Sequence, residues 1–191
     1  LRPECISFNN EKDELVVYQS KLVNIFTSDG MFKTAYRIPH YLMQVVPYED
    51  GYLAIESESN NPENKFAFLV IDSEVRDVKT FYFEEQSCLM LSEYILKTQQ
   101  NEIIINRPLW DVIYKYSDGN VSADRRLEFP RNKMDYSLID WQDVDSFVDM
   151  LEQSPDKFAF MTYNETNNYE YYEFNRGFFN TRVYICKKNR K

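Results

Sequence analysis

The sequence has few of the residues on which most catalytic and cofactor-binding motifs depend. It contains one histidine, His40, and only four glycines among 191 residues. A single histidine excludes a zinc site of several histidines, and the three cysteines at 5, 88 and 186 are too far apart to complement it. Four glycines can hardly supply a glycine-rich phosphate loop, and no Gly-x-Ser-x-Gly nucleophile elbow occurs. We therefore expect no catalytic residue set and no cofactor.

Basic residues and long apolar runs are also scarce. Lysine and arginine number 22 against 31 acidic residues, which gives a net charge of −9. This balance argues against nucleic acid as a partner, because binding to phosphates requires a basic surface. No stretch approaches the roughly 18 to 20 apolar residues that a membrane-spanning helix needs. We expect neither a nucleic-acid partner nor an integral membrane segment.

Aromatic residues are abundant, with 15 tyrosines and 14 phenylalanines, and they favour strands over helices. Two runs rich in aromatic and β-branched residues flank the turn Ser117-Asp118-Gly119-Asn120. An Asp-Gly pair between such runs predicts a β-hairpin, because glycine adopts positive φ without steric cost. The same Ser-Asp-Gly turn occurs upstream at residues 28–30. The chain therefore contains a repeated hairpin design.

The repeat extends to four units of up to four short strands. The turns at Gly30, Glu74, Gly119 and Gly177 are separated by 44, 45 and 58 residues. The longest spacing contains residues 143–152, whose apolar positions recur with the spacing of an amphipathic helix. A period near 45 residues with four strands per unit is typical of a β-propeller. We predict an all-β fold, a β-propeller of four-stranded antiparallel blades. The whole chain, 1–191, would form one propeller domain or a propeller fragment, with blades at about 4–38, 40–83, 88–129 and 131–186.

Two runs of the sequence carry a resemblance to a known family. Leu15-Val-Val-Tyr18 followed by residues 22–32, and residues 113–129, resemble segments of NHL-like six-bladed β-propellers of Gram-negative bacteria, most of them of unknown function. The resemblance implies a six-bladed ring of which this chain supplies about four blades, unless the chain is a four-bladed variant. It also implies export to the periplasm or the cell surface, often as a lipoprotein anchored through a removed N-terminus. It implies no catalytic residues.

Propeller topology places two sets of loops on one face, those between strands 2 and 3 and those between successive blades. That face gathers the candidate ligand-binding residues His40, Arg107, Trp110, Asp140, Trp141 and Asn164, with further amides at 60, 61 and 168. Tryptophan beside amides, carboxylates and arginine suits recognition of sugars or peptides through stacking and hydrogen bonds. The alternative interpretation is that Trp110 and Trp141 cover the edges of the core.

Three functions are compatible with these features. The first is an exported, non-catalytic binding module for a protein or glycan ligand. The second is a metal-dependent enzyme of the lactonase or hydrolase type, with Glu93, Gln44 and Asn9 near the inner ends of strands as candidate ligands. The third is a structural or assembly protein that pairs through open blade faces. We favour the first, because the propeller period and the tryptophan-bearing face suit binding and no catalytic residue set is visible, and we keep the other two as alternatives.

Overall fold

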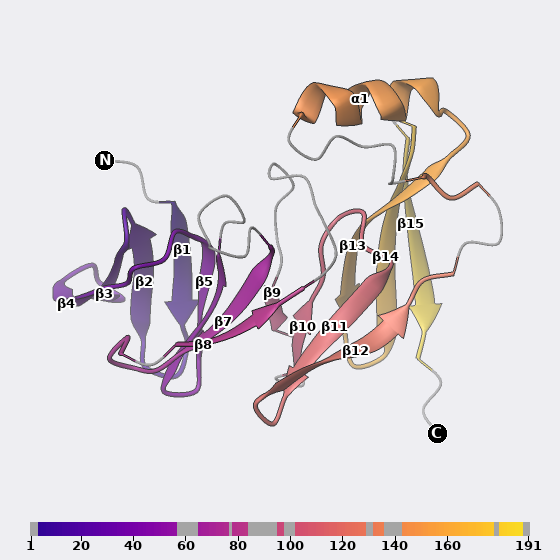
Figure 1. The fold of residues 1–191 in the computed structure, drawn as a ribbon. Coiled ribbons are helices and arrows are strands. Elements are labelled where there is room, and N and C mark those ends of the chain that lie inside the picture. Colours follow the sequence, from indigo (N-terminus) through magenta and orange to yellow (C-terminus); the bar gives the residue numbers. More distant parts are fainter. Residues whose placement is uncertain are drawn as a thin grey trace. The chain divides into compact units, whose positions relative to one another are not determined.

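The computed structural model covers residues 1–191 and describes all of them except 1–3, 57–64, 77, 84–94, 98–101, 129–131, 136–142, 178–179 and 189–191. The described part is almost entirely β-structure, with a single α-helix (Figure 1). The chain divides into two compact units, Leu1–Gln86 and Ser87–Lys191. Among the described residues, no helix has the length and apolar character that a membrane crossing requires.

The first unit contains two antiparallel sheets of four strands each, in the order β1-β2-β3-β4 and β5-β6-β7-β8. Each sheet is a simple meander, because every strand pairs with its neighbour in the sequence. The strands of the first sheet are β1 (Cys5–Asn9), β2 (Glu14–Gln19), β3 (Leu22–Thr27) and β4 (Phe32–Arg37). Those of the second are β5 (Leu42–Tyr48), β6 (Gly51–Glu56), β7 (Ala67–Ile71) and β8 (Val78–Tyr82).

The second unit contains a four-stranded sheet, a helix and a three-stranded sheet, and both sheets are again antiparallel meanders. The four strands are β9 (Ile95–Lys97), β10 (Ile103–Ile105), β11 (Val112–Ser117) and β12 (Asn120–Arg126). Helix α1 (Val144–Gln153) precedes β13 (Phe158–Glu165), β14 (Tyr169–Arg176) and β15 (Asn180–Lys187). The carboxylate of Asp143 caps the helix by accepting a hydrogen bond from the backbone N–H of Asp145.

The two Ser-Asp-Gly turns differ in their geometry. Asp118 and Gly119 have φ values of 50° and 74° and form a two-residue loop between the paired Ser117 and Asn120. Positive φ at both loop residues suits the twist of a hairpin and explains the Asp-Gly pair. In the first turn only Gly30 has positive φ, and β4 begins two residues later, so that loop is longer. The sequence motif predicts both turns, but it does not fix the loop length.

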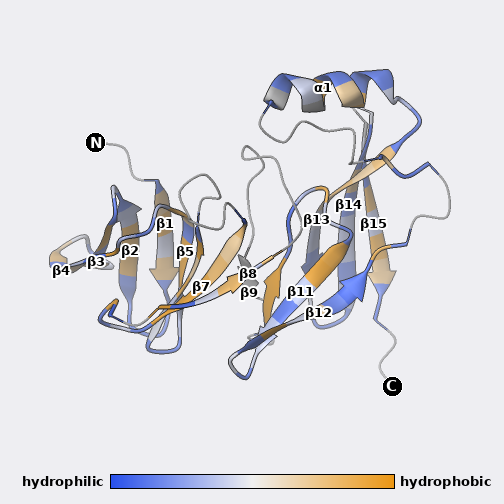
Figure 2. Cartoon of the chain, in the orientation of Figure 1, coloured by the Kyte–Doolittle hydropathy of each residue, from blue (hydrophilic) through white to orange (hydrophobic). Residues whose placement is uncertain are grey.

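The core of the first unit lies between its two sheets. The side chains of Val16, Tyr18, Val23 and Ile25 from the first sheet belong to one buried cluster with residues of the second sheet such as Leu42, Val45, Ala54 and Leu69. Strand β7 is apolar along its whole length and stands out in orange in Figure 2. A strand that is apolar without alternation is covered on both faces.

The second unit has two apolar clusters. One joins Ile104 and Ile113 of the β9–β12 sheet to Phe160 and Tyr163 of β13. The other contains Leu151 of α1 together with Leu109, Met134 and Ala159. The β13–β14–β15 sheet therefore packs on the β9–β12 sheet through one face, and the helix is anchored by its apolar side.

The predicted all-β class with antiparallel four-stranded units is confirmed. The amphipathic helix predicted at 143–152 is also confirmed, as α1, and it stands before a sheet of three described strands. Most of the first strand predicted for the third unit, residues 88–97, lies outside the described residues, and β9 is the part that is described.

Candidate ligand-binding site

The structure describes four of the six candidate ligand-binding residues, which are His40, Arg107, Trp110 and Asn164. Asp140 and Trp141 lie outside the described residues, as do Asn60, Asn61 and Glu93. His40 belongs to the first unit and the other three belong to the second.

His40 lies in the connection between β4 and β5 and is engaged within the first unit. Its Nδ1 atom is 2.6 Å from Oε1 of Glu56, a carboxylate that is 3% exposed. The backbone around it is also held, because the hydroxyl of Tyr18 donates to the carbonyl of His40 and accepts from the N–H of Leu42. The His40 ring therefore serves as the partner of a buried carboxylate.

Arg107 and Trp110 are part of the interior of the second unit. Arg107 is 0% exposed and Trp110 is 1% exposed. The guanidinium carbon of Arg107 lies 5.8 Å from the centre of the Trp110 ring, and that ring contacts Tyr114 edge to face at 5.9 Å. A ring enclosed in this way has no free face on which a sugar could stack. This arrangement agrees with the interpretation that Trp110 belongs to the core.

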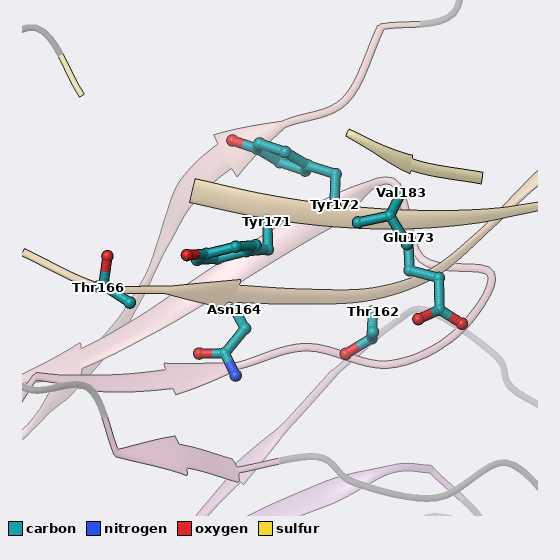
Figure 3. Close-up of a pocket in the computed structure, with 7 residues that line it drawn as sticks. All are labelled: Thr162, Asn164, Thr166, Tyr171, Tyr172, Glu173 and Val183. Atoms are coloured by element: carbon teal, nitrogen blue, oxygen red, sulfur yellow. The ribbon is translucent and has the colours of Figure 1, made fainter. Parts of the chain in front are cut away.

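Asn164 is exposed and lines a pocket of about 350 Å³ on the outer face of the β13–β14–β15 sheet (Figure 3). We use "outer face" for the face of this sheet opposite the one that packs on Ile104 and Ile113. The volume falls within the range of small-molecule sites, roughly 300 to 1,000 Å³. The pocket is lined by Thr162, Asn164, Thr166, Tyr171, Tyr172, Glu173 and Val183.

Strand register explains why these side chains meet. Thr162 pairs with Glu173, which pairs with Val183 of β15, so the three form one row across the sheet. Asn164 pairs with Tyr171 in the next row of the same face, because side chains two residues apart in a strand point to the same side. Tyr171 and Tyr172 accordingly project to opposite sides of β14 (Figure 3). The pocket thus combines an aromatic ring, an amide, hydroxyls and a carboxylate.

An ionic cluster around the buried carboxylate of Glu165 lies on the opposite, inner face of the same sheet. The carboxylate of Glu165, 5% exposed, accepts a hydrogen bond of 2.6 Å from the hydroxyl of Tyr163 and lies 2.7 Å from Nζ of Lys188. Burial alone would raise the pKa of Glu165, but the hydrogen bonds from Lys188 and Tyr163, with the charge of Arg125, hold that pKa below its ordinary value. The carboxylate is therefore kept ionised inside the protein.

Arg125 of β12 connects this cluster to the neighbouring sheet. It donates to the carboxylate of Glu170 at 2.5 Å and to the hydroxyl of Tyr172 at 3.1 Å, and its guanidinium stacks 5.0 Å from the ring centre of Tyr163. Burial by itself would lower the pKa of Arg125. The hydrogen bonds to Glu170 and Tyr172 outweigh that effect and raise the pKa above its ordinary value, so the guanidinium stays charged. No local sequence pattern predicts this cluster, since Arg125 and Glu165 are 40 positions apart.

The two faces of the sheet suit different tasks. The inner cluster pairs its charges within the protein and fastens β12 to β13 and β14, which is a structural role. The outer pocket presents groups that a sugar or a peptide can contact. Among the residues that the structure describes, no group of three or more histidine, cysteine or acidic side chains is arranged to hold a metal ion. Of the candidate metal ligands, Asn9 uses its side-chain oxygen to accept from the N–H groups of Glu11 and Lys12 in its own turn.

Comparison with solved structures identifies the fold. A candidate exported protein of Bacteroides fragilis superposes with a TM-score of 0.77 at 15% sequence identity, over 98% of this chain and 56% of that one. BamB from Moraxella catarrhalis gives 0.49 at 9% identity, over 97% and 50%, and virginiamycin B lyase from Staphylococcus aureus gives 0.47 at 17% identity, over 97% and 54%. The chain spans about half the length of these structures.

With its four antiparallel sheets, the chain is a β-propeller of about four blades. Similarity at 15% identity supports the fold and not a function. No protein-family model matches the chain, and no curated protein matches it. The resemblance to NHL-like six-bladed propellers therefore stays a prediction.

Proposed function

We propose that this protein is a non-catalytic binding β-propeller whose ligand is a glycan, held in the pocket on the outer face of β13–β14–β15. The observation that carries the proposal is the pocket itself. The ring of Tyr171 offers an apolar surface on which a sugar ring can pack, and Asn164 and Glu173 offer a hydrogen-bond donor and acceptors for its hydroxyls. The second ligand that fits is an exposed protein loop whose hydroxyl and amide groups can form the same hydrogen bonds.

We further propose that the four sheets together form one propeller domain. We also propose that the protein is exported to the periplasm or the cell surface. Export is supported by the resemblance described above and by the Bacteroides fragilis structure, which is that of a candidate exported protein. Fractionation of the source cells, followed by immunoblotting, tests this part. A protein found only in the cytoplasmic fraction would contradict it.

Thermal melts with a panel of oligosaccharides test the ligand. A glycan present at about 100 times its Kd adds about 2.7 kcal/mol, which for a chain of this length is on the order of 5 to 11 °C. Asn164→Ala and Tyr171→Ala should each remove most of that shift. Asn10→Ala, which changes an exposed amide in the turn between β1 and β2, should leave it intact.

The same melts separate the competing functions. A shift produced by calcium and reversed by EDTA would favour the metal-dependent enzyme. A glycan shift that Asn164→Ala and Tyr171→Ala leave unchanged would place the ligand elsewhere and refute the pocket. Melts that no glycan shifts at millimolar concentration would refute the glycan and leave a protein ligand.

A further inference from the structure

Strand β15, drawn in yellow in Figure 1, forms an edge of the β13–β14–β15 sheet. Its eight residues pair with β14 without a bulge, and among the described residues no strand pairs with its other side. Val183, Tyr184 and Ile185 at its centre are 58%, 50% and 61% exposed. An edge strand that is long, regular and apolar is a template for pairing with another chain.

Strand register identifies the main-chain groups that point outward from this edge. The N–H of Lys188 donates to the carbonyl of Asn168, so this pair, one step beyond the strand, is a hydrogen-bonded one. Hydrogen-bonded and non-hydrogen-bonded pairs alternate along an antiparallel ladder. The N–H and C=O groups directed away from β14 therefore belong to alternate residues of β15, which are Thr181, Val183, Ile185 and Lys187. They form a row of donors and acceptors that a further strand can use.

Strand β15 occupies the place of the last strand in its blade. It follows Gly177, as β4 follows Gly30 and β12 follows Gly119. The three described strands thus correspond to the second, third and fourth of a blade, and the place of the first lies beside β13. That side is covered, because the side-chain amide of Asn106 accepts from the N–H of Tyr163 and donates to its carbonyl. The open edge of this sheet is the one at β15.

Two other strands in the same place, β4 and β12, are protected in ways that β15 is not. Each contains a bulge, and they carry Lys33 and Arg37, and three consecutive charges at 124–126. Bulges and charges keep edge strands from pairing with other chains. Residues 183–186 of β15 include no charge. Propeller blades pack face to face, so a further blade would cover a face of this sheet and leave the edge open.

The charges of β15 indicate the chemistry of a partner strand. Arg182 and Lys187 flank its apolar centre, and the strand contains no acidic residue. Neither side chain forms an ion pair within the part of the chain that the structure describes. This short basic segment stands in a chain whose net charge is −9. A second β15 would bring two more positive charges to the edge, whereas a strand with acidic residues would complement it.

We propose that β15 binds an extended peptide segment of a partner protein as an additional strand of the sheet, one with an apolar centre and an acidic residue towards each end. Main-chain hydrogen bonds supply affinity in this mode of recognition, and the flanking charges supply selectivity. A short peptide should bind with a Kd on the order of 100 µM. That Kd should rise with salt, because both cations are exposed.

Fluorescence anisotropy of a labelled eight-residue peptide, with alternating valine and threonine between two terminal glutamates, tests the proposal on the full chain. Ile185→Pro removes one outward N–H and should raise Kd about fivefold or more. Proline is tolerated in edge strands, and a thermal melt checks that the variant folds. Ile185→Val is the matched control, because it keeps the N–H and should change Kd about twofold or less. A peptide with lysines in place of the glutamates should bind about tenfold more weakly.

Two further peptides, N-methylated on alternate residues in opposite phase, test strand pairing without changing the protein. Only one should bind, because a single set of N–H groups in the added strand faces β15. Equal binding of both would show adsorption through side chains and would overturn the proposal. So would the absence of binding at 1 mM peptide.

Sedimentation velocity of the protein without peptide tests the other occupant. A dimer that Ile185→Pro disrupts would show that a second copy occupies the edge, which also contradicts the proposal. Asn164→Ala should leave peptide binding unchanged, because the edge contact uses main-chain groups of β15 and Asn164 lies on β13. The peptide proposal and the glycan proposal can therefore fail separately.

Discussion

The hydroxyl of Tyr163 donates a hydrogen bond of 2.6 Å to the carboxylate of Glu165, two residues further along β13. Both side chains lie on the inner face of the sheet, where Arg125 and Lys188 supply the positive charge that Glu165 needs. Desolvation and the bond to Glu165 raise the pKa of Tyr163, so the phenol remains a donor at every physiological pH. The pair therefore acts as a fixed connection at the junction of β12, β13 and β14.

Replacing Glu165 with glutamine should destabilise the protein by about 2 kcal/mol at pH 7, because Lys188 and Arg125 lose the carboxylate they face. The pKa of Glu165 in the folded protein lies below the ordinary 4.5, so the unfolded state takes up the proton first as the pH falls. The stabilisation is therefore complete above about pH 4.5 and is lost below it, as the pH passes through the folded pKa. Chemical unfolding at pH 7 and pH 3.5 measures this.

The difference in stability between wild type and Glu165→Gln should shrink on acidification. Glu173→Gln, a change on the outer face of the same sheet, should cost less than about 0.5 kcal/mol. A Glu165→Gln variant as stable as the wild type at pH 7 would show that the cluster does not hold the sheets together.

His40 and Glu56 should behave as a coupled pair in a double-mutant cycle. Removing the imidazole by His40→Ala leaves a buried carboxylate without its partner, which should cost about 1 to 3 kcal/mol. In the Glu56→Gln background the same change should cost less, with a coupling energy of about 1 kcal/mol measured by urea unfolding. Additive effects would mean that the 2.6 Å contact contributes nothing, and His40 would again be available to a ligand.

Two glycines should resist substitution for different reasons. A Cβ on Gly51 would lie 2.1 Å from the carbonyl oxygen of Ile71, so Gly51→Ala forces β6 away from β7 and should cost about 3 kcal/mol. Gly119 has open space around it but φ of +74°, so Gly119→Ala should cost about 1 kcal/mol through backbone strain.

Gly119→Asn separates strain from crowding, since asparagine tolerates this conformation. It should lose less stability than Gly119→Ala in the same thermal melts. A Gly51→Ala variant that melts with the wild type would show that the two strands are not as close as the structure has them.

Trp110 should report a buried environment. The chain has two tryptophans, so Trp141→Phe leaves Trp110 as the single fluorophore. Its emission should be blue-shifted and only weakly quenched by acrylamide, because the ring is 1% exposed. Titration with glycans should not change this signal. Strong quenching, or a response to a glycan, would restore Trp110 as a ligand-binding residue.

The arrangement of strands could be predicted because its signals are local. Asp118 and Gly119 sit where positive φ is required. The turns at Gly30, Glu74, Gly119 and Gly177 recur after 44, 45 and 58 residues and mark the repeat. The apolar spacing of α1 and the unbroken apolar run of β7 can likewise be recognised within a window of about ten residues. The sequence therefore indicated the strands, the helix and the repeat without any knowledge of contacts between sheets.

The candidate site was harder to predict because it depends on contacts between distant residues. Loop topology grouped Arg107 and Trp110 with Asn164, but it carries no information on depth, and the first two are enclosed while Asn164 is exposed. The pocket arises from the register of β13, β14 and β15. A shift of one residue would turn Tyr171 and Asn164 to the opposite face. No local pattern in the sequence fixes that register.

Every sheet is built from strands that are consecutive in the chain, and this has a consequence for how the protein acquires its structure. Hairpins close quickly when their strands are neighbours, so each sheet can assemble from its own stretch of a few tens of residues. Strands β1 to β4 can pair while later residues are still being synthesised. The core-facing side of this sheet stays exposed until β5 to β8, which follow in the sequence, pack against it. We therefore expect the sheets to fold in chain order during synthesis, beginning with the N-terminal sheet.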